Sequence, residues 1–211
     1  MSSVTPPAET TTTRMRAEDR RILVLEAATG VFGERGYHGA TTDAVARAAG
    51  VSQPYVVRMF GSKEAMFLAV LDRAVDRILG SFDRELGALA GDGAPPDQDA
   101  LARCLGSSYV DLLSDRGLLL SFMQAFMLGS DPVVGPHARS AFRRVYTYLR
   151  ERVGLTPEAT HDFLSYGMLL NTVVGLRMAD DYAAHPDVRE LLDEMLPTKL
   201  EVLLSLRGAS S

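Results

Sequence analysis

Side chains of kinds that hydrogen-bond to nucleic-acid bases stand close together in one short stretch of this chain. Gln53 carries an amide, Arg58 carries a guanidinium, and Tyr55 between them adds a planar ring and a hydroxyl. In the major groove an amide can bind adenine through two hydrogen bonds, and a guanidinium can bind guanine in the same way. With Ser52 and Pro54 beside them, these residues predict the outward face of a short DNA-binding helix.

Three apolar residues of the same stretch predict the opposite face of that helix. Val51, Val56 and Phe60 are separated by five and four residues, which brings them back to a similar side. We expect this side to pack on a scaffold while the polar side stays exposed. The stretch therefore has the two chemically distinct faces of a recognition helix.

The starts of the two neighbouring helices predict contacts with the DNA backbone. A helix N-terminus presents free N–H groups that bind phosphate oxygens. Thr41 and Thr42 stand at the start of the preceding helix, and Lys63 stands at the start of the following one. Such contacts set the register of a protein on the duplex and do not read its sequence.

Positive charge is concentrated at the front of the chain. Up to Lys63 there are eight Lys or Arg against six Asp or Glu, whereas the remainder has fourteen against twenty-one, and the net charge is -5. This distribution suits a small head that binds a polyanion on an acidic body. An arm of four arginines could touch phosphate or the minor groove, although a solvated helix start explains them equally well: Arg14, Arg16, Arg20 and Arg21.

The first residues predict a disordered tail followed by an amphipathic helix. Residues 1–16 are rich in Ser, Thr and Pro. A first helix runs from about Ala17 to Arg35, where Gly36 is placed to end it. Its apolar stripe comprises Ile22, Leu25, Ala28 and Phe32.

Two further short helices complete a three-helix unit over residues 17–63. Thr41 is placed to cap the second helix, and Gly50 breaks it. Ser52 is placed to cap the third helix, which ends near Phe60. Two short helices that meet at a glycine turn predict a helix-turn-helix.

A long fourth helix connects this unit to the rest of the chain. Ser62 caps it, and apolar periodicity continues over residues 64–86. The sequence GALAGDGAPP over residues 87–96 gathers glycine and proline and predicts a flexible connection.

Five more apolar-periodic segments predict a larger helical domain over residues 97–206. No stretch shows the alternation typical of a strand. The segments are Asp97–Ser114, Arg116–Leu128, Pro132–Val153, Pro157–Asp181 and Pro186–Leu206. The chain is therefore predicted to be all-α, with about nine helices: an N-terminal three-helix helix-turn-helix domain and a larger C-terminal helical bundle.

One segment resembles the TetR family of transcriptional regulators. The resemblance is carried by VLEAATGVFGERGYHGATTDAVARAAGVSQPYVVRMFGSKEAMF, from Val24 to Phe67. Within it, Val57 stands where members often have tyrosine, and Tyr55 stands where a small residue is usual. The remainder of the chain is similar only in helix number and length.

The resemblance implies a homodimeric regulator, by family habit a repressor, that binds a palindromic operator and is released by a small-molecule effector. It places Thr41, Thr42, Gln53, Pro54, Tyr55, Arg58 and Lys63 at the double-stranded DNA, and the outward face of the third helix adds Ser52 to this predicted set. A two-fold axis would set two half-sites about one helical turn, ~34 Å, or a multiple apart.

Aromatic and methionine side chains of the larger domain are typical of an adaptable pocket, although plain core packing explains each of them too. The candidates for the effector pocket are Tyr109, Phe122, Met123, Phe126, Met127, Phe142, Tyr146, Phe163 and Asn171. Asn171 could orient a ligand by hydrogen bonding.

The last two predicted helices are more apolar than one covered face requires, which predicts a dimer interface. The residues that carry this surplus are Phe163, Leu170, Val173, Val174, Leu176, Leu192, Met195, Leu196, Leu200 and Leu203. Burial against a second copy would explain it.

Several other functions find no support in the residues. The single cysteine, Cys104, permits no internal disulfide and indicates a reducing compartment. No apolar run is long enough for a membrane span, so a cytoplasmic protein is expected. The chain has no phosphate loop or nucleophile elbow, and its four histidines stand far apart, so we predict no enzyme, no metal and no cofactor.

The main alternative is a helical ligand-binding or adaptor protein that keeps the head fold without sequence-specific DNA binding. The valine at position 57 favours this alternative slightly. Operator binding should weaken steeply with added salt, which separates the two hypotheses.

Overall fold

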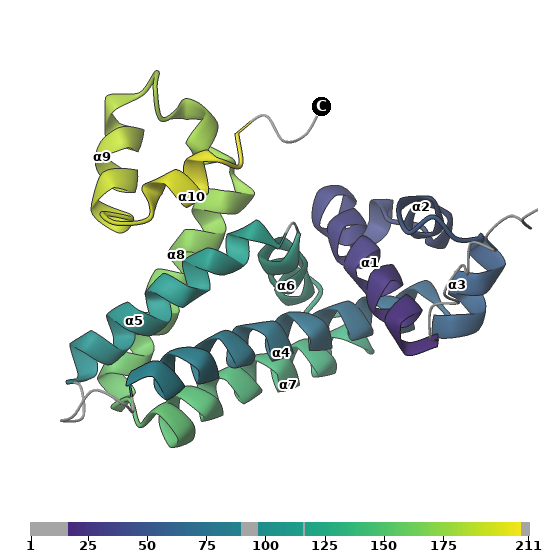
Figure 1. Ribbon diagram of the computed structural model, residues 1–211, viewed down its shortest axis with the longest axis horizontal. Coiled ribbons are helices and arrows are strands. Elements are labelled where there is room, and N and C mark those ends of the chain that lie inside the picture. Colours follow the sequence, from purple (N-terminus) through teal and green to yellow (C-terminus); the bar gives the residue numbers. More distant parts are fainter. Residues whose placement is uncertain (1–16, 90–96, 116, 208–211) are drawn as a thin grey trace, which may run out of the picture.

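The computed structural model describes residues 17–89, 97–115 and 117–207, and throughout these residues all regular structure is helical (Figure 1). The predicted tail, with Arg14 and Arg16, and most of the predicted connection lie outside the described residues. The prediction of an all-α fold with a small N-terminal unit and a larger helical body is confirmed.

Helix α1 (Ala17–Gly39) changes direction where the sequence predicts its end. Gly36 has φ 72° and ψ 169°, a conformation that favours glycine, and one further turn follows it. The buried side of the helix includes Val24, Ala28 and Phe32. The prediction for Ile22 is wrong, because its side chain is 52% exposed.

The helix-turn-helix consists of α2 (Thr42–Ala48) and α3 (Gln53–Phe60). The Thr41 hydroxyl accepts a hydrogen bond from the N–H of Ala44 at 3.0 Å, as a capping residue should. Gly50 between the helices has φ 65°. Ser52 holds the cap position of α3, but its side chain makes no capping hydrogen bond, which corrects the predicted role.

This difference between two similar hydroxyl residues predicts different mutational effects. Thr41→Ala should lower the free energy of unfolding by about 1 kcal/mol, since it leaves the N–H of Ala44 without a partner. Ser52→Ala should change it by less than about 0.5 kcal/mol. Urea denaturation of both variants measures the two values, and equal losses would contradict the assignment of the cap.

Helix α4 (Lys63–Leu89) runs from the head along one side of the body, beside α7 (Figure 1). The Ser62 hydroxyl accepts a hydrogen bond from Ala65 N–H at 3.0 Å and so begins the helix as predicted. Its predicted apolar side is buried: Met66, Phe67, Val70, Leu71, Val75 and Ile78.

The body is built around α4 by six further α-helices and three short helical turns. Their bounds are α5 (Gln98–Asp111), η1 (Leu112–Ser114), α6 (Leu118–Met127), α7 (Val134–Thr147), η2 (Tyr148–Val153), α8 (Pro157–Gly175), η3 (Met178–Asp181), α9 (Pro186–Met195) and α10 (Leu200–Leu204). The segment predicted as one last helix therefore forms two helices, α9 and α10, because Pro197 cannot continue α9. The described residues contain ten α-helices where about nine were predicted.

Helix α7 packs lengthwise on α4, and a row of polar contacts ties the two together. Asp76 accepts a hydrogen bond from Arg144 at 2.6 Å, and one His137 ring nitrogen lies 2.9 Å from Asp72. Further along, the Tyr148 hydroxyl donates to Asp83 at 2.7 Å. These contacts repeat along α4 and fix how the two helices are aligned.

The head is joined to the body chiefly where α1 crosses α6. Ser121 donates a hydrogen bond to the carbonyl oxygen of Thr29 at 3.2 Å, and Gln124 donates to that of Phe32 at 2.9 Å. At the crossing a β-carbon on Gly33 would lie 2.3 Å from the Cα of Gly117. The two backbones therefore touch, and only glycine permits this distance.

Candidate nucleic-acid interface

Helix α3 presents the two faces that its sequence predicts. Val56 is fully buried against the head, and Val51 and Phe60 are partly buried beside it. Gln53, Pro54 and Arg58 are exposed, with Ser52 exposed next to them. Tyr55 is half-buried. The polar side of α3 is therefore free to contact a ligand over its first two turns.

The exposed start of α3 is attached to the start of α2. The Gln53 amide donates a hydrogen bond to the Thr42 hydroxyl at 3.1 Å. The N–H of Val51 donates to the Ala46 carbonyl at 3.0 Å and closes the turn between the helices. Thr41, Thr42 and Gln53 consequently form one polar edge. The residues predicted to contact the DNA backbone thus lie next to the residue predicted to contact a base.

Two arginines from the start of α1 reach α3 and enlarge its positive surface. Arg20 lies over the Tyr55 ring at 5.6 Å, and Arg58 lies over the same ring at 5.2 Å. Arg21 lies over the Phe60 ring at 4.5 Å. Such contacts between guanidinium groups and aromatic faces are favourable, so Tyr55 is held by Arg20 and Arg58.

Lys63, a predicted phosphate contact, has partners within the head. Its ammonium donates a hydrogen bond to the His38 carbonyl at 3.1 Å and lies 4.9 Å from the centre of the Tyr37 ring. This side chain therefore fixes the bend after α1 against the start of α4. Lys63 is also the first residue of α4, where a helix has free backbone N–H groups.

Six of the nine residues predicted for the effector pocket line one cavity in the body. It is enclosed by Tyr109, Phe122, Phe126, Phe142 and Asn171, together with Phe163, and has a volume of about 40 Å³. Met123 and Tyr146 do not line it, and Met127 is 83% exposed. A cavity of this size holds water, whereas drug-sized ligands need roughly 300 Å³ or more.

The polar end of this cavity is closed by Tyr109 and Asn171. The Tyr109 hydroxyl lies 3.1 Å from the amide oxygen of Asn171 and 3.0 Å from its nitrogen. Burial raises the pKa of Tyr109 to about 12, although the hydrogen bond with Asn171 acts in the opposite direction. The phenol is therefore neutral, and the two side chains satisfy each other.

Two larger hollows were not predicted from the sequence. A groove of about 460 Å³ lies between α5, α8 and the segment that joins α9 to α10, with Gly106, Tyr166 and Leu196 among its walls. A cleft of about 270 Å³ lies between α1 and the body. Both depend on the break at Pro197 or on the packing of distant helices, which local patterns do not report.

The structure corrects the predicted dimer interface. Seven of its ten predicted residues are buried within the single chain: Phe163, Leu170, Val173, Leu192, Met195, Leu196 and Leu203. Val174 and Leu200 are partly buried, and Leu176 alone of the ten is exposed. The apolar surplus that predicted a partner is therefore used by the core of the body itself.

The described residues offer no other reactive site. They contain no group of three His, Cys, Asp or Glu side chains placed to hold a metal. Burial and a hydrogen bond to Glu85 raise the pKa of Cys104 to about 11, so its thiol stays protonated near neutral pH. Among these residues, no helix combines the length and apolar character that crossing a membrane requires.

The fold and the α2–α3 geometry define a two-part helical protein with a helix-turn-helix head. Residues 24–70 match the family model described as bacterial regulatory proteins, tetR family. The segment that contains the helix-turn-helix is thus similar to the TetR family.

Curated relatives match the front of the chain. The transcriptional activator FasR of Mycolicibacterium smegmatis is 42% identical over 73 residues, 35% of this chain and 33% of that protein. The regulator EthR of Mycobacterium tuberculosis is 31% identical over 102 residues, 48% of this chain and 45% of that protein. The chain thus spans less than half the length of these relatives, whose names are those of regulators and not of enzymes.

Solved structures match over nearly the whole chain, at low identity. A TetR-like regulator from Rhodococcus sp. RHA1 aligns with a TM-score of 0.55 and 22% identity, covering 94% of this chain and 100% of the other. A tetR-family regulator from Streptomyces coelicolor aligns with a TM-score of 0.54 and 19% identity, covering 90% and 89%. These likenesses establish the fold of the body as well as the head.

Proposed function

We propose that this protein is a transcriptional regulator that binds operator DNA as a homodimer and changes its affinity when a small molecule binds to the body. The observation that carries the proposal is the exposed polar side of α3, where Gln53, Tyr55 and Arg58 stand on a helix anchored by the buried Val56. A bound dimer excludes other proteins from the DNA that it covers, which makes repression the direct consequence of binding.

In the proposed complex, α3 lies in the major groove. Arg58 binds a guanine edge and Gln53 binds an adenine edge, while Arg20 keeps the Tyr55 ring against the groove wall. The starts of α2 and α4, with Thr41, Thr42 and Lys63, lie against phosphates on either side. Arg20 and Arg21 add backbone contacts of their own.

Selection of bound sequences from random duplex DNA tests this proposal, and we expect a palindrome. Arg58→Ala should weaken binding to the selected site about 5- to 150-fold, equivalent to about 1–3 kcal/mol, and relax the sequence preference at one position. Arg103→Ala removes the same charge from an exposed position on α5 and should leave the affinity nearly unchanged.

The alternative of a ligand-binding or adaptor protein makes the opposite prediction. Val57 is 40% exposed on α3, and an apolar residue there suits a protein partner better than a phosphate. If no sequence is enriched at low salt, or if Arg58→Ala and Arg103→Ala have equal effects, the adaptor hypothesis replaces the proposed regulator.

We place the dimer interface on the exposed apolar residues of α7 and α8. On α8 the exposed apolar side chains are Met168, Leu169 and Leu176, at 37%, 41% and 69%. Phe142 and Tyr146 are exposed on α7, and Phe142 lines the same cavity as Met168, so the two helices are neighbours there. A two-fold axis would bury such a surface against its own copy.

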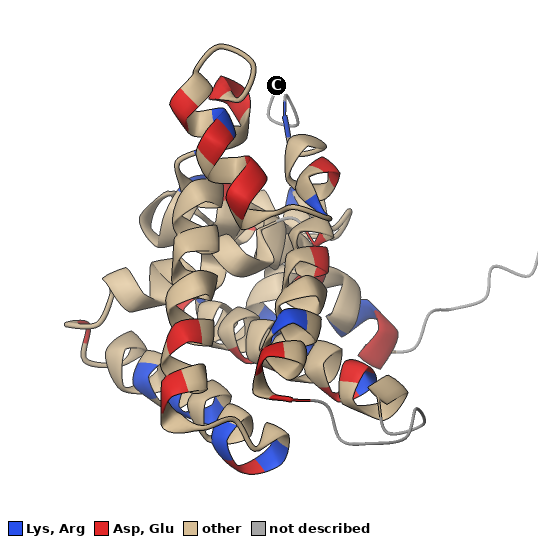
Figure 2. Cartoon of the chain, turned by 90° about the vertical axis from the view of Figure 1, so that its left-hand side faces the viewer, with Lys and Arg blue, Asp and Glu red and all other residues tan. Residues whose placement is uncertain are grey.

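The opposite end of the body has a surface of different character. Helix α9 exposes Asp187, Glu190, Asp193 and Glu194 with the single Arg189. In Figure 2 acidic positions are coloured red along the ribbon at this outer part of the body. Like charges on both copies would repel if two such helices met. The charge pattern therefore also favours α7 and α8 over α9 for pairing.

The dimer proposal predicts a change of mass on substitution. The double variant Leu169→Glu with Leu176→Glu should sediment as a monomer. Each chain would bring two carboxylates to the two-fold interface, so that a dimer would have to bury four negative charges. Leu23→Glu, at a residue that is 44% exposed on α1, should remain a dimer. Sedimentation equilibrium measures both, and a monomeric wild type or a dimeric double variant would contradict the interface.

A further inference from the structure

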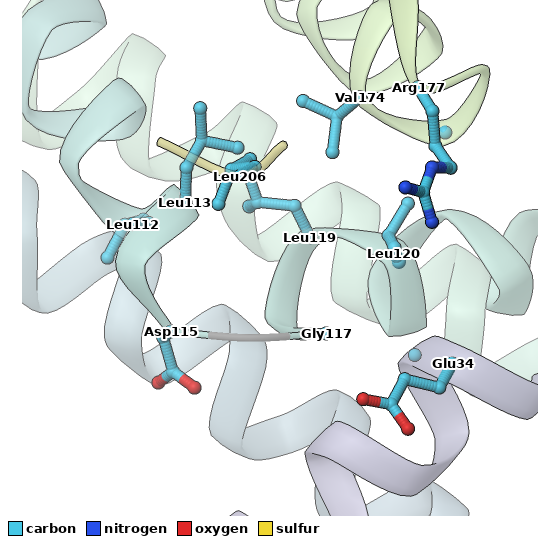
Figure 3. Close-up of a pocket in the computed structure, with 12 residues that line it drawn as sticks. Glu34, Leu112, Leu113, Asp115, Gly117, Leu119, Leu120, Val174, Arg177 and Leu206 are labelled. Atoms are coloured by element: carbon cyan, nitrogen blue, oxygen red, sulfur yellow. The ribbon is translucent and has the colours of Figure 1, made fainter. Parts of the chain in front are cut away.

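The cleft between α1 and the body brings together side chains of both parts of the molecule. Its volume is about 270 Å³. Gly33 and Glu34 of α1 form one wall, and η1, the start of α6 and the end of α8 form the others. Leucine side chains from these elements line the space between (Figure 3). A molecule in this cleft would touch the head and the body at once.

Glu34 presents an unpaired carboxylate to the cleft. It is an exposed residue of α1 and has no hydrogen-bond or ion-pair partner among the described residues. The other carboxylate of the lining, Asp115, differs in this respect, because Arg73 lies 2.9 Å from it and Arg77 lies 3.7 Å from it. Glu34 is therefore the group in this cleft that is free to bind a cation.

Arg177 presents a guanidinium to the same cleft from the short link between α8 and η3. Only its Nε is engaged, by Asp180 at 2.9 Å, so both terminal nitrogens are free of partners among the described residues. Its backbone has φ 56° and ψ 35°, and no other non-glycine residue of the described part has a positive φ. Glycine or asparagine is usual at this position after a helix, yet here an arginine is placed over the cleft.

The two charges do not neutralise each other across the cleft. No nitrogen of Arg177 lies within 4.0 Å of a Glu34 oxygen, since no ion pair joins them. In Figure 3 they reach in from opposite walls with Leu120 between them. The cleft thus offers an anion-binding end, an apolar middle and a cation-binding end.

We propose that this cleft is a binding site for a small molecule with an apolar segment between a carboxylate and a protonated amine. Arg177 binds the carboxylate through its free terminal nitrogens, Glu34 binds the amine, and the leucines cover the segment between. The volume, just below that of drug-sized sites, limits the ligand to a small metabolite.

The groove between α5 and α8 fits this chemistry less well. Its charged rim carries both signs close together, with Arg103 and Lys199 among Asp99, Asp162 and Glu194, and Lys199 is already bonded to Asp111 at 2.5 Å. None of its lining residues belongs to the head. Of these two hollows, only the cleft has opposite charges that are separated from each other, and only the cleft is in direct contact with α1.

A ligand in the cleft would bias the arrangement of head and body. This consequence rests on the proposed function, because it matters only if the spacing of two α3 helices governs DNA binding. The ligand would connect Glu34 to α8 beside the crossing of α1 and α6. Binding itself can be measured without DNA, which keeps the two proposals separable.

The test uses three probes on the full chain: 6-aminohexanoate, hexanoate and hexylamine. Leucine methyl groups labelled for NMR report binding directly. We expect 6-aminohexanoate to bind at least about tenfold more tightly than either of the other two. Glu34→Gln should abolish its advantage over hexanoate, and Arg177→Gln should abolish its advantage over hexylamine.

Two matched variants locate the site. Glu18→Gln removes an exposed carboxylate from α1 outside the cleft, and Arg103→Gln removes a guanidinium from the groove. Neither should change the affinity for 6-aminohexanoate. A larger effect of Arg103→Gln than of Arg177→Gln, equal affinities for the three probes, or no methyl shifts with 6-aminohexanoate would overturn the proposal, whatever the DNA experiments show.

Discussion

Replacing Gly33 by alanine should lower the free energy of unfolding by about 1–3 kcal/mol, whereas the same change at Gly30, one turn earlier in α1, should raise it by up to about 1 kcal/mol. A β-carbon on Gly33 meets the backbone of Gly117 at 2.3 Å, and a backbone atom cannot be moved by a change of rotamer. A β-carbon on Gly30 meets nothing within 4 Å. The two changes therefore share a helix and differ only in what surrounds them.

Gly117 is the other half of this contact and should be more sensitive still. A β-carbon there would lie 2.5 Å from the carbonyl oxygen of Thr29, and the residue has φ 81°. The left-handed conformation adds about 1–2 kcal/mol for alanine to the cost of the clash. Gly117→Ala should therefore destabilise the chain more than Gly33→Ala.

Denaturant midpoints at constant slope measure all three variants. If Gly33→Ala and Gly30→Ala shift the denaturant midpoint in the same direction, α1 and α6 do not meet as closely as described. In operator-binding assays, Gly33→Ala should also alter the affinity, because the crossing of α1 and α6 sets how the head sits on the body. Gly30→Ala should preserve that affinity.

Arg73→Met should cost about 2–3 kcal/mol of stability, while Arg77→Met should cost less than about 0.5 kcal/mol. The Arg73 side chain is 12% exposed and lies 2.9 Å from Asp115 and 3.6 Å from Glu26, so it joins α4 to both η1 and α1. The Asp115 side chain is 15% exposed, and its charge would lose its close partner. Arg77 is 50% exposed and lies 3.7 Å from the same carboxylate, where water screens the pair.

A double variant separates loss of a charge partner from loss of packing. If the cost of Arg73→Met comes from leaving the Asp115 carboxylate unpaired, adding Asp115→Leu should recover part of the lost stability. Additive losses in the double variant would show that the arginine contributes through packing alone. Thermal unfolding of the four proteins, wild type included, completes this comparison.

The head could be predicted from sequence because local signals determine it. Thr41 and Ser62 are caps, Gly36 and Gly50 take positive φ, and Val56 is buried, each as its residue type and spacing indicate. Short helices that end at glycines leave few arrangements to choose from. The prediction for Ile22 was wrong, since apolar periodicity shows which residues share a side of a helix but not whether a neighbouring helix covers that side.

In the body, amino-acid type alone could not distinguish core, cavity and surface. Leu192 and Leu176 are both leucines at helical spacing, yet one is fully buried and the other is 69% exposed. Which of them is covered depends on helices far away in the chain and on the break at Pro197. For the same reason the interior cavity was partly predicted, through Tyr109 and Asn171, whereas the cleft was not.

By itself, the sequence determined the helical class, the order of the helices and the polar side of α3, because capping, periodicity and glycine conformations act within a few residues. Only the tertiary structure decided that Arg20 lies on Tyr55, that Gly33 touches Gly117, and that Glu34 and Arg177 share a cleft without pairing. Such contacts join residues that are far apart in the chain, and their distances follow from how whole helices pack.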